Sequence, residues 1–412
     1  EISCSLVGSE MCIRDRENMQ HSNLHSKCIE PARRVSCVSE YYFSKKLREI
    51  AEMNRKGMQV ISLGIGGPDL PPHADVIDTL CRESRKADTH SYQPYTGIAE
   101  LRQAFAGWYD RMYGVSLDPQ REILPLIGSK EGILHISLAF LNRGDGVLVP
   151  NPGYPTYSSV SRLAEAEIFP YDLVEEQGWM PDFEALERLP LERIKLMWVN
   201  YPNMPTGASA SPELFARLVD FGRRHGIVIV NDNPYSFILN EHPLSILSTP
   251  GAREVCIEMN SLSKSHNMAG WRIGMAAARP EFIEWILRVK SNIDSGMFRP
   301  LQSAAAEALN APAEWYAELN RVYGERRAAA EKIMHRIGCR FDPKQTGLFV
   351  WGRIPETERD SESLSERILH EARVFVTPGF IFGSRGDRYI RISLCATVEM
   401  INEALRRIES VF

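Results

Sequence analysis

The sequence has no long hydrophobic run and no long block of Lys and Arg residues. Its most apolar stretch, GILHISLAFL from Gly132, is too short to span a bilayer and contains His135. The formal net charge is -5 at pH 7. We therefore expect no transmembrane segment and no nucleic acid as the main partner. Small molecules are the expected ligands.

Cysteine is sparse: the 412 residues contain 8, and no two have C-x-x-C spacing. Cys81, Cys256, Cys339 and Cys395 lie in apolar or helical stretches. This pattern is typical of thiols used as small hydrophobic residues in a reducing compartment, and it disfavours both a disulfide framework and a zinc site. We expect a cytoplasmic protein without a bound metal.

The first residues, EISCSLVGSEMCIRDR, lack the basic start and the continuous apolar centre of a signal peptide. They resemble translated sequencing-adapter read-through, which would make Met19 the natural start. The alternative is an ordinary disordered tail. In either case we expect residues 1–28 to lie outside the fold.

The remaining chain is expected to form two domains, because its length exceeds what one hydrophobic core usually serves. Helical spacing of apolar residues over 38–56 predicts a helix that ends at Gly57. We assign 29–70 to an N-terminal arm and helix of a smaller domain, 71–300 to a large domain, and 301–412 to the rest of the smaller α+β domain.

Short apolar runs alternate with helical segments in the large domain, which predicts a mostly parallel sheet sandwiched by helices. The runs are EILPLI, GVLVP, AEIFPY, IKLMWVN, GIVIVND, EVCIEMN and RIGMAAA. Polar or Gly/Pro clusters follow many of them, namely GSKEG, NPGYP, NYPNMPTG, NDNPY and NSLSK. Ligands of open α/β sheets bind outside the carboxyl ends of the strands, so we expect these loops to form one site.

Three loops carry residues suited to chemistry. Asp232 ends a β-branched strand, where a buried carboxylate needs a cation unless it is a plain turn or cap residue. Gly128 and Ser129 lie between a strand and a helix, where free N–H groups bind phosphate or form an ordinary N-cap. Lys264 stands among small hydroxyl residues, which indicates a lysine held for a reaction rather than for solubility.

Two common nucleotide-binding motifs are missing from these loops. IGSKEG lacks the upstream glycine of a P-loop. GIGGPD has Pro68 and Asp69 where a dinucleotide-binding motif has its glycine-bearing helix start. A nicotinamide-dependent enzyme is therefore disfavoured.

From Ser39 to the C-terminus, the chain resembles the class I aminotransferases among the fold type I pyridoxal 5′-phosphate (PLP) enzymes. The resemblance rests on SLSKSHNMAGWRIG, NYPNMPTG, NDNPY and YIRISL, which occur in the family's order. It implies an α/β fold with a large PLP-binding domain and a smaller α+β domain. It also implies that Lys264 binds the cofactor aldehyde covalently.

Further roles are implied by the same resemblance. Asp232 would keep the pyridine nitrogen protonated, Asn203 and Tyr235 would hydrogen-bond the phenolic oxygen, and Tyr154 would stack on the ring. The implied phosphate ligands are Ser129, Lys130, Ser261, Ser263 and Arg272, together with Tyr92 and Asn292 from a neighbouring subunit. Arg391 and the backbone of Gly66 would receive the substrate α-carboxylate. The active form would be a homodimer.

The implied reaction is ping-pong transfer of an amino group from an L-amino acid to a 2-oxo acid. We expect 2-oxoglutarate in one half-reaction and an acidic or aromatic amino acid in the other, with diaminopimelate also open because SNIDSGMFRP resembles a segment of LL-diaminopimelate aminotransferases. Lys130 or Arg299 could meet a second carboxylate, although Arg299 also suits a solvated surface. A PLP-dependent C–S β-lyase and a regulatory protein on the same scaffold are the alternatives.

Overall fold

A computed structural model describes residues 29–412 of the chain, so the expectation for residues 1–28 lies outside the described part. The chain divides into two compact units, one ending at Cys37 and the other running from Val38 to Phe412. In its described part the first unit has one short helix, α2 (Arg33–Ser36). The second unit contains all the features discussed below.

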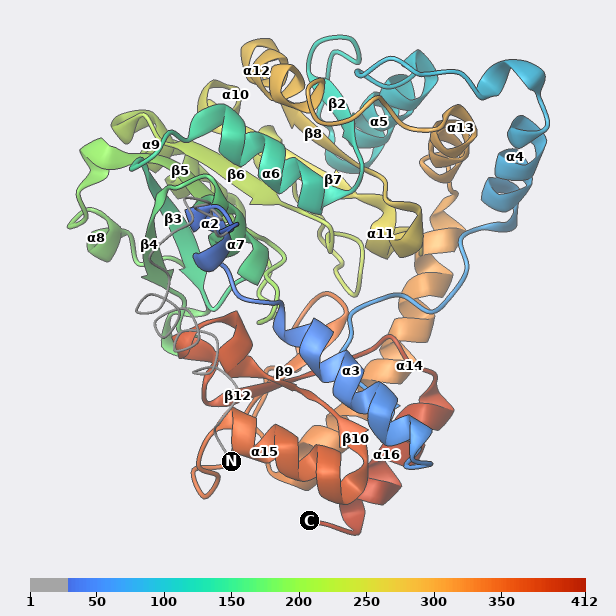
Figure 1. The fold of residues 1–412 in the computed structure, drawn as a ribbon, viewed down its shortest axis with the longest axis vertical. Coiled ribbons are helices and arrows are strands. Elements are labelled where there is room, and N and C mark those ends of the chain that lie inside the picture. The colour runs from blue at the N-terminus through green and yellow to red at the C-terminus, as the bar shows by residue number, and fades with distance from the viewer. Residues whose placement is uncertain (1–28) are drawn as a thin grey trace, which may run out of the picture. The chain divides into compact units, whose positions relative to one another are not determined.

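A seven-stranded sheet forms the centre of this unit, in the order β2-β8-β7-β6-β5-β3-β4 (Figure 1). β8 runs antiparallel to both of its neighbours, and the other pairs are parallel. The prediction of a mostly parallel sheet is confirmed, and each of the seven apolar runs forms one strand. The strands are β2 (Ile123–Leu126), β3 (Gly146–Asn151), β4 (Glu167–Asp172), β5 (Ile194–Val199), β6 (Val228–Asp232), β7 (Cys256–Ser261) and β8 (Gly274–Ala278).

Helices cover both faces of the sheet, because successive side chains of its strands point to opposite sides. In β5, Leu196 and Trp198 pack into one hydrophobic core, while Met197 and Val199 pack into the other. The first core is covered by α6 (Ser129–Phe140), α7 (Pro155–Leu163) and α12 (Pro280–Lys290). The second is covered by α4 (Ala74–Ser84), α5 (Ala99–Tyr113), α8 (Phe183–Leu186), α9 (Pro212–His225), α10 (Ala252–Val255) and α13 (Arg299–Ala308).

The C-terminal part has its own sheet, in the order β11-β12-β9, with antiparallel pairing. Its strands are β9 (Phe349–Arg353), β11 (Thr377–Pro378) and β12 (Tyr389–Ser393), and its helices are α14 (Ala313–Ile337), α15 (Ser361–Arg367) and α16 (Val398–Glu409). These elements share a separate hydrophobic core. The α+β character expected for this part is therefore present.

The N-terminal helix α3 (Tyr42–Arg55) packs on this C-terminal part. β1 (Ile61–Ser62) pairs in parallel with β10 (Val374–Phe375). The ammonium of Lys46 lies 2.7 Å from Glu49 and 2.6 Å from Glu366, which ties α3 to α15. These contacts agree with the assignment of the N-terminal arm to the smaller domain, although the exact domain boundaries stay a prediction.

Candidate active site

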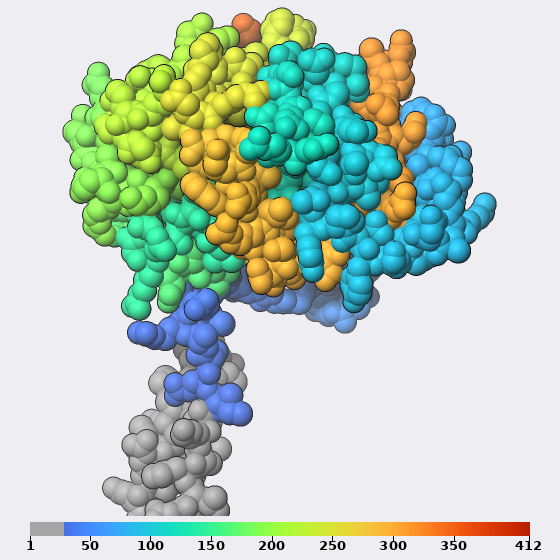
Figure 2. All heavy atoms as spheres, turned by 90° about the horizontal axis from the view of Figure 1, so that it is seen from above, coloured from blue at the N-terminus to red at the C-terminus, as the bar shows by residue number. Residues whose placement is uncertain are grey.

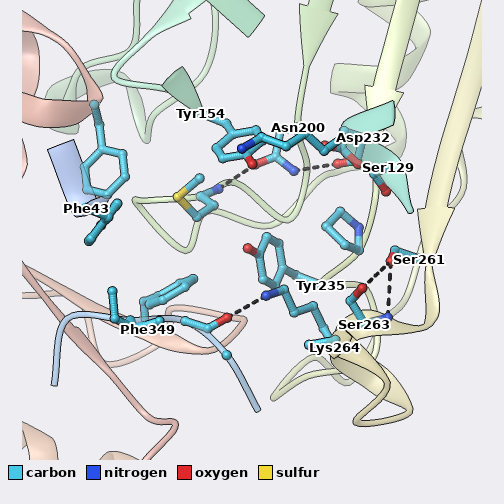
Figure 3. A pocket seen from close by; sticks show the side chains of 18 of the residues that line it. Phe43, Ser129, Tyr154, Asn200, Asp232, Tyr235, Ser261, Ser263, Lys264 and Phe349 are labelled. Carbon is cyan, nitrogen blue, oxygen red and sulfur yellow. Dashed lines mark hydrogen bonds between the residues drawn. The ribbon is translucent and has the colours of Figure 1, made fainter. Parts of the chain in front are cut away.

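The loops at the carboxyl ends of the central strands, together with α3, β9 and β12, enclose a cavity of about 430 Å³ (Figure 3). This is the convergence that the loop positions predicted. Eleven residues predicted for the site line the cavity: Gly66, Ser129, Lys130, Tyr154, Asp232, Tyr235, Ser261, Ser263, Lys264, Arg272 and Arg391.

Lys264 lies in the short helix α11 (Leu262–Ser265), directly after β7, so its side chain enters the cavity from the end of a central strand. Its Nζ donates to the carbonyl oxygen of Gly66 at 2.5 Å. Burial lowers the pKa of this amine, and the guanidinium groups of Arg391 and Arg272 act in the same direction. The amine is therefore more easily deprotonated than an exposed lysine.

Asp232 is the last residue of β6 and is buried. The hydroxyl of Tyr157 donates to its Oδ2 at 2.9 Å, while its Oδ1 has no hydrogen-bond partner. Burial raises the pKa of the carboxyl to about 6. An unpartnered, buried acceptor in a cavity wall favours a ligand with an N–H group at this point.

An anion site lies at the N-terminus of α6. Gly128 is the N-cap with φ +78° and no side-chain cap, so the first N–H groups of the helix lack that partner. The hydroxyl of Ser129 is buried and has no hydrogen-bond partner. The hydroxyls of Ser261 and Ser263 lie 2.9 Å apart, and Nη1 of Arg272 is 3.5 Å from Ser263 Oγ. Hydroxyls, a helix N-terminus and a guanidinium together suit a phosphate.

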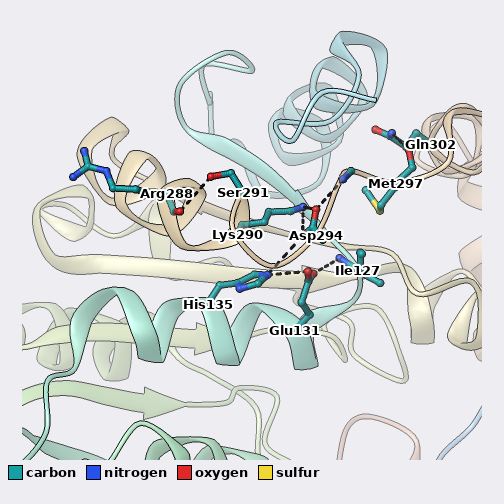
Figure 4. A network of polar contacts seen from close by, with 10 residues as sticks. Ile127, Glu131, His135, Arg288, Lys290, Ser291, Asp294, Met297 and Gln302 are labelled. Atoms are coloured by element: carbon teal, nitrogen blue, oxygen red, sulfur yellow. Dashed lines mark hydrogen bonds and ion pairs between the residues drawn. The ribbon is translucent and has the colours of Figure 1, made fainter. Parts of the chain in front are cut away.

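A polar network behind this anion site holds α6 in place (Figure 4). Glu131 accepts hydrogen bonds from the backbone N–H of Ile127 at 2.5 Å and from His135 Nε2 at 2.8 Å. Nearby, the buried Lys290 donates to both carboxylate oxygens of Asp294, at 2.7 and 2.6 Å. Glu131 is thereby committed to the network, although it lies only two residues after Ser129.

Arg391, in β12, is buried and has no carboxylate partner among the described residues. Its guanidinium donates to Gly64 O at 2.9 Å and lies 3.9 Å from the ring centre of Phe349, while its Nε has no partner. Burial lowers the pKa of this guanidinium to about 10. A buried cation without a counter-charge is costly, so the position favours an anionic ligand such as a carboxylate.

Three predicted site residues lie outside the cavity wall. Asn203 uses its amide within its own loop: Nδ2 donates to Asn200 O at 3.2 Å, and Oδ1 accepts from the Thr206 hydroxyl at 2.8 Å. Asn203 thus does not line the cavity, whereas Met204 of the same loop does, and the contact of Asn203 with the cofactor stays a prediction. Tyr92 is 91% exposed, and Asn292 Nδ2 bonds back to Arg288 O. Neither Tyr92 nor Asn292 lines the cavity of its own chain.

The sequence analysis did not single out several residues of the wall. Tyr157, which binds Asp232, lies one helical turn after Tyr154, so its spacing was an available signal. Tyr41, Phe43 and Leu47 also line the cavity, although apolar residues at helical spacing predict only a packed face.

The donor set fits PLP: an amine with a lowered pKa, an unpartnered carboxylate oxygen, an anion site and an unpaired guanidinium lie around one cavity. The aromatic ring of Tyr154 and the hydroxyl of Tyr235 complete its wall.

None of the described helices is both long and apolar enough to cross a membrane.

Comparison with known proteins gives a consistent result. Residues 58–408 match the model of a family described as aminotransferase class I and II. The chain is 42% identical to the LL-diaminopimelate aminotransferase of Moorella thermoacetica over 385 residues, covering 93% of this chain and 98% of that protein. It is 41% identical to the enzyme of the same name from Desulforudis audaxviator, covering 92% and 96%.

Solved structures of similar fold include apo-BacF from Bacillus subtilis, with a TM-score of 0.90 and 36% identity over 93% of this chain and 98% of that chain. The aromatic aminotransferase from Pyrococcus horikoshii OT3 has a TM-score of 0.83 and 30% identity, covering 92% and 97%.

Proposed function

The chain belongs to the class I and II aminotransferases, which use PLP, and from this premise we propose that it moves the α-amino group of an L-amino acid to 2-oxoglutarate by a ping-pong mechanism. The observation that carries the proposal is the pairing, in one cavity, of a half-buried lysine with a lowered pKa at Lys264 and a buried, unpaired guanidinium at Arg391. An amino acid needs both, one for its Cα proton and the other for its carboxylate.

The residues around the cavity would hold PLP at both of its polar ends. Oδ1 of Asp232 would accept the N–H of the pyridine ring, and the hydroxyl of Tyr235 would donate to the phenolic oxygen. Ser129, Ser261, Ser263 and Arg272 would bind the phosphate with the N-terminus of α6. When bound, PLP supplies an electron sink for the electron pair of the substrate Cα–H bond.

Lys264 would then act as the general base of the reaction. Its Nζ, made less basic by burial, would accept the proton from the Cα of the donor and, in the second half-reaction, would deliver a proton to the Cα of the amino acid that is formed. Arg391 holds the α-carboxylate with two parallel N–H groups, which fixes the Cα–H bond toward Nζ. The low polarity around Arg391 strengthens this ion pair.

For the amino-acid donor we propose several candidate classes. Acidic and aromatic amino acids are our first candidates, and the names of the most similar relatives add LL-diaminopimelate. Lys130 could receive a second carboxylate, since its ammonium faces the cavity and pairs with no described carboxylate. Arg299, the first residue of α13, does not line the cavity, which favours its reading as a surface residue.

We also propose a homodimer in the cytoplasm. The segments that contain Tyr92 and Asn292 lie side by side, because a Cβ on Gly296 would be 2.7 Å from Gln93 O. They belong to the neighbouring light-blue and orange regions of the surface in Figure 2. The exposed Tyr92 and Ile293 on this surface support a subunit contact. The free thiols of the described cysteines support a reducing compartment.

The test is an absorption spectrum of the purified protein with PLP, recorded before and after addition of glutamate and then of 2-oxoglutarate. We expect glutamate to remove the absorption band of the lysine-bound cofactor and 2-oxoglutarate to restore it. The Lys264→Ala variant should lose turnover and keep its fold, whereas Lys195→Ala, on an exposed position of β5, should keep both. Normal turnover by Lys264→Ala would refute the assignment, and release of pyruvate and ammonia from cystathionine without an acceptor would favour a β-lyase.

A further inference from the structure

One side of the cavity is formed by residues that have not yet been assigned a role. Tyr41, Phe43 and Leu47, at the start of α3, line the cavity, and we call them the α3 wall. The rings of Tyr41 and Phe43 are 5.6 Å apart. In Figure 3, Phe43 and Phe349 lie at the end of the cavity opposite Ser261 and Ser263. Phe43, of the α3 wall, therefore lies away from the serine side of the anion site, whereas Tyr41 lies beside Lys130.

The two fixed ends of a bound amino acid direct its side chain toward this wall. Under the proposed function, on which this inference rests, the α-carboxylate lies on Arg391 and the Cα lies beside Lys264. The guanidinium of Arg391 is 5.9 Å from the ring centre of Phe43. The anion site and Asp232 are taken by the cofactor, so the substrate side chain is left with the remaining wall, of which the α3 wall is a large apolar part.

The charges of the cavity argue against a side chain with a second ammonium group. Asp232 is the only acidic residue among the described residues that line the cavity, and its carboxylate binds Tyr157 at the far side. No described carboxylate of the wall can therefore receive a distal ammonium. Burying such a charge without a partner is costly, whereas an apolar side chain gains free energy from contact with Phe43 and Leu47.

A second carboxylate of a substrate also has few cationic partners near the α3 wall. Among the described residues of the cavity wall, Lys130 is the cation that the proposed function assigns neither to the cofactor nor to the α-carboxylate. Its Nζ lies 4.9 Å from the ring centre of Tyr41, and Lys130 belongs to the first turn of α6, beside the anion site. The ammonium of Lys130 thus lies against the aromatic ring of Tyr41.

We propose that the α3 wall determines substrate specificity and narrows the candidate donors: it selects amino acids with apolar or aromatic side chains over the acidic candidates and LL-diaminopimelate, which carry a second charged group. Phe43 and Leu47 would contact the side chain directly, while Tyr41 would separate it from Lys130. The selection differs from what the names of the most similar relatives suggest, and it can be measured without knowledge of the natural substrate.

The first experiment compares kcat/KM for four donors with 2-oxoglutarate as acceptor: phenylalanine, leucine, aspartate and LL-diaminopimelate. We expect phenylalanine or leucine to exceed both charged donors by about tenfold or more, since single apolar groups in a pocket change specificity by that order. Equal or better use of aspartate or LL-diaminopimelate would overturn the inference and leave the proposed function intact. Failure of every donor to change the cofactor spectrum would instead refute the proposed function.

The second experiment removes part of the wall. Leu47→Ala should lower the ratio of kcat/KM for phenylalanine to that for alanine by about tenfold. Met400→Ala is the matched control, because Met400 is a helical residue of similar exposure, 44% against 45% for Leu47, and does not line the cavity. An unchanged ratio in Leu47→Ala, with Met400→Ala also unchanged, would show that the wall does not determine specificity.

Discussion

At the scale of single residues, burial shifts the pKa values of Asp232 and Lys264 in opposite directions. It raises the pKa of Asp232 to about 6 and lowers the pKa of Lys264, so both are shifted toward their neutral forms. A neutral lysine suits a base that must accept a proton. The carboxylate of Asp232 instead needs a cationic partner, which the protonated ring nitrogen of the cofactor would provide.

This difference predicts a pH-dependent stability of the protein freed of cofactor. The folded-state pKa of Asp232 lies above its unfolded value of 3.8, so the stability linked to its protonation is present at low pH and lost as pH rises through about 6. Asp232→Asn cannot ionise and escapes this loss. From about pH 4 to 8, the free energy of unfolding of the variant minus that of wild type should rise, by up to about 3 kcal/mol.

Urea unfolding across this pH range measures the effect. The same substitution in the cofactor-loaded protein serves as the comparison and should destabilise it, because the charge pair with the ring is then lost. A difference in unfolding free energy that stays constant with pH in cofactor-free protein would contradict the raised pKa.

At the scale of elements, the anion site depends on the backbone turn between β2 and α6. Gly128 has φ +78°, and a Cβ there would overlap the guanidinium of Arg272. Gly144 has a similar φ, +84°, and a Cβ there would meet nothing within 4 Å. Both Gly→Ala variants place an alanine at a positive φ, but only one moves a proposed phosphate ligand.

We therefore expect Gly128→Ala to weaken PLP binding by about tenfold or more, equivalent to about 1.4 kcal/mol, and Gly144→Ala to leave it unchanged. Equilibrium titration of the cofactor-free variants with PLP measures both constants. Equal affinities in the two variants would show that Arg272 does not need its present position.

Helix α12 offers a second comparison between a buried and an exposed ion pair with the same spacing. Lys290 is 1% exposed and binds Asp294 at 2.6 Å, whereas Arg288 is exposed and binds Glu284 at 2.8 Å. Lys290→Met leaves a half-buried carboxylate without its partner and should cost about 3 kcal/mol of unfolding free energy. Arg288→Met should cost less than about 1 kcal/mol.

Chemical denaturation of the two variants, with wild type beside them, decides the matter. A similar small loss in both would mean that the network of Figure 4 contributes little to the stability of the fold.

At the scale of the whole molecule, the site is assembled from segments far apart in the chain. Gly66 follows β1, whose partner β10 lies in the C-terminal part. Arg326 of α14 holds Asp69 through two hydrogen bonds of 2.6 and 2.8 Å, which fixes the loop after Gly66. Arg391 arrives from β12, and Lys264 from the central sheet. The central sheet and the C-terminal sheet must therefore keep their relative positions for the reaction to occur.

The proposed dimer gives a prediction at this scale. If Tyr92 completes the site of the partner subunit, Tyr92→Ala and Lys264→Ala should each be nearly inactive as pure proteins. Unfolded together in equal amounts and refolded, they should regain about a quarter of wild-type activity, because half of the dimers are mixed and each has one intact site. Absence of recovery, with mixed dimers shown by native mass spectrometry, would contradict a shared site.

The sequence by itself predicted the sheet and many of the residues that line the cavity. Short apolar runs bounded by turn residues favour buried strands, and a polar residue directly after such a strand lies at the ligand-binding edge, so Asp232 and the convergence of the loops followed from local pattern. The lysine among hydroxyl residues and the order of the loops indicated the family. These signals depend on residues that are close together in the chain, so they can be recognised from the sequence alone.

Only the tertiary structure decided which loop and helix residues face the cavity. Asn203 is occupied inside its own turn, and Met204 takes the wall, because hydrogen bonding within a loop cannot be read from its letters. Phe43 and Leu47 show the periodicity of any packed helix, and only the pairing of α3 with the C-terminal part turns that face toward Arg391. The substrate side of the site is thus a product of long-range packing, whereas its cofactor side is largely a product of sequence.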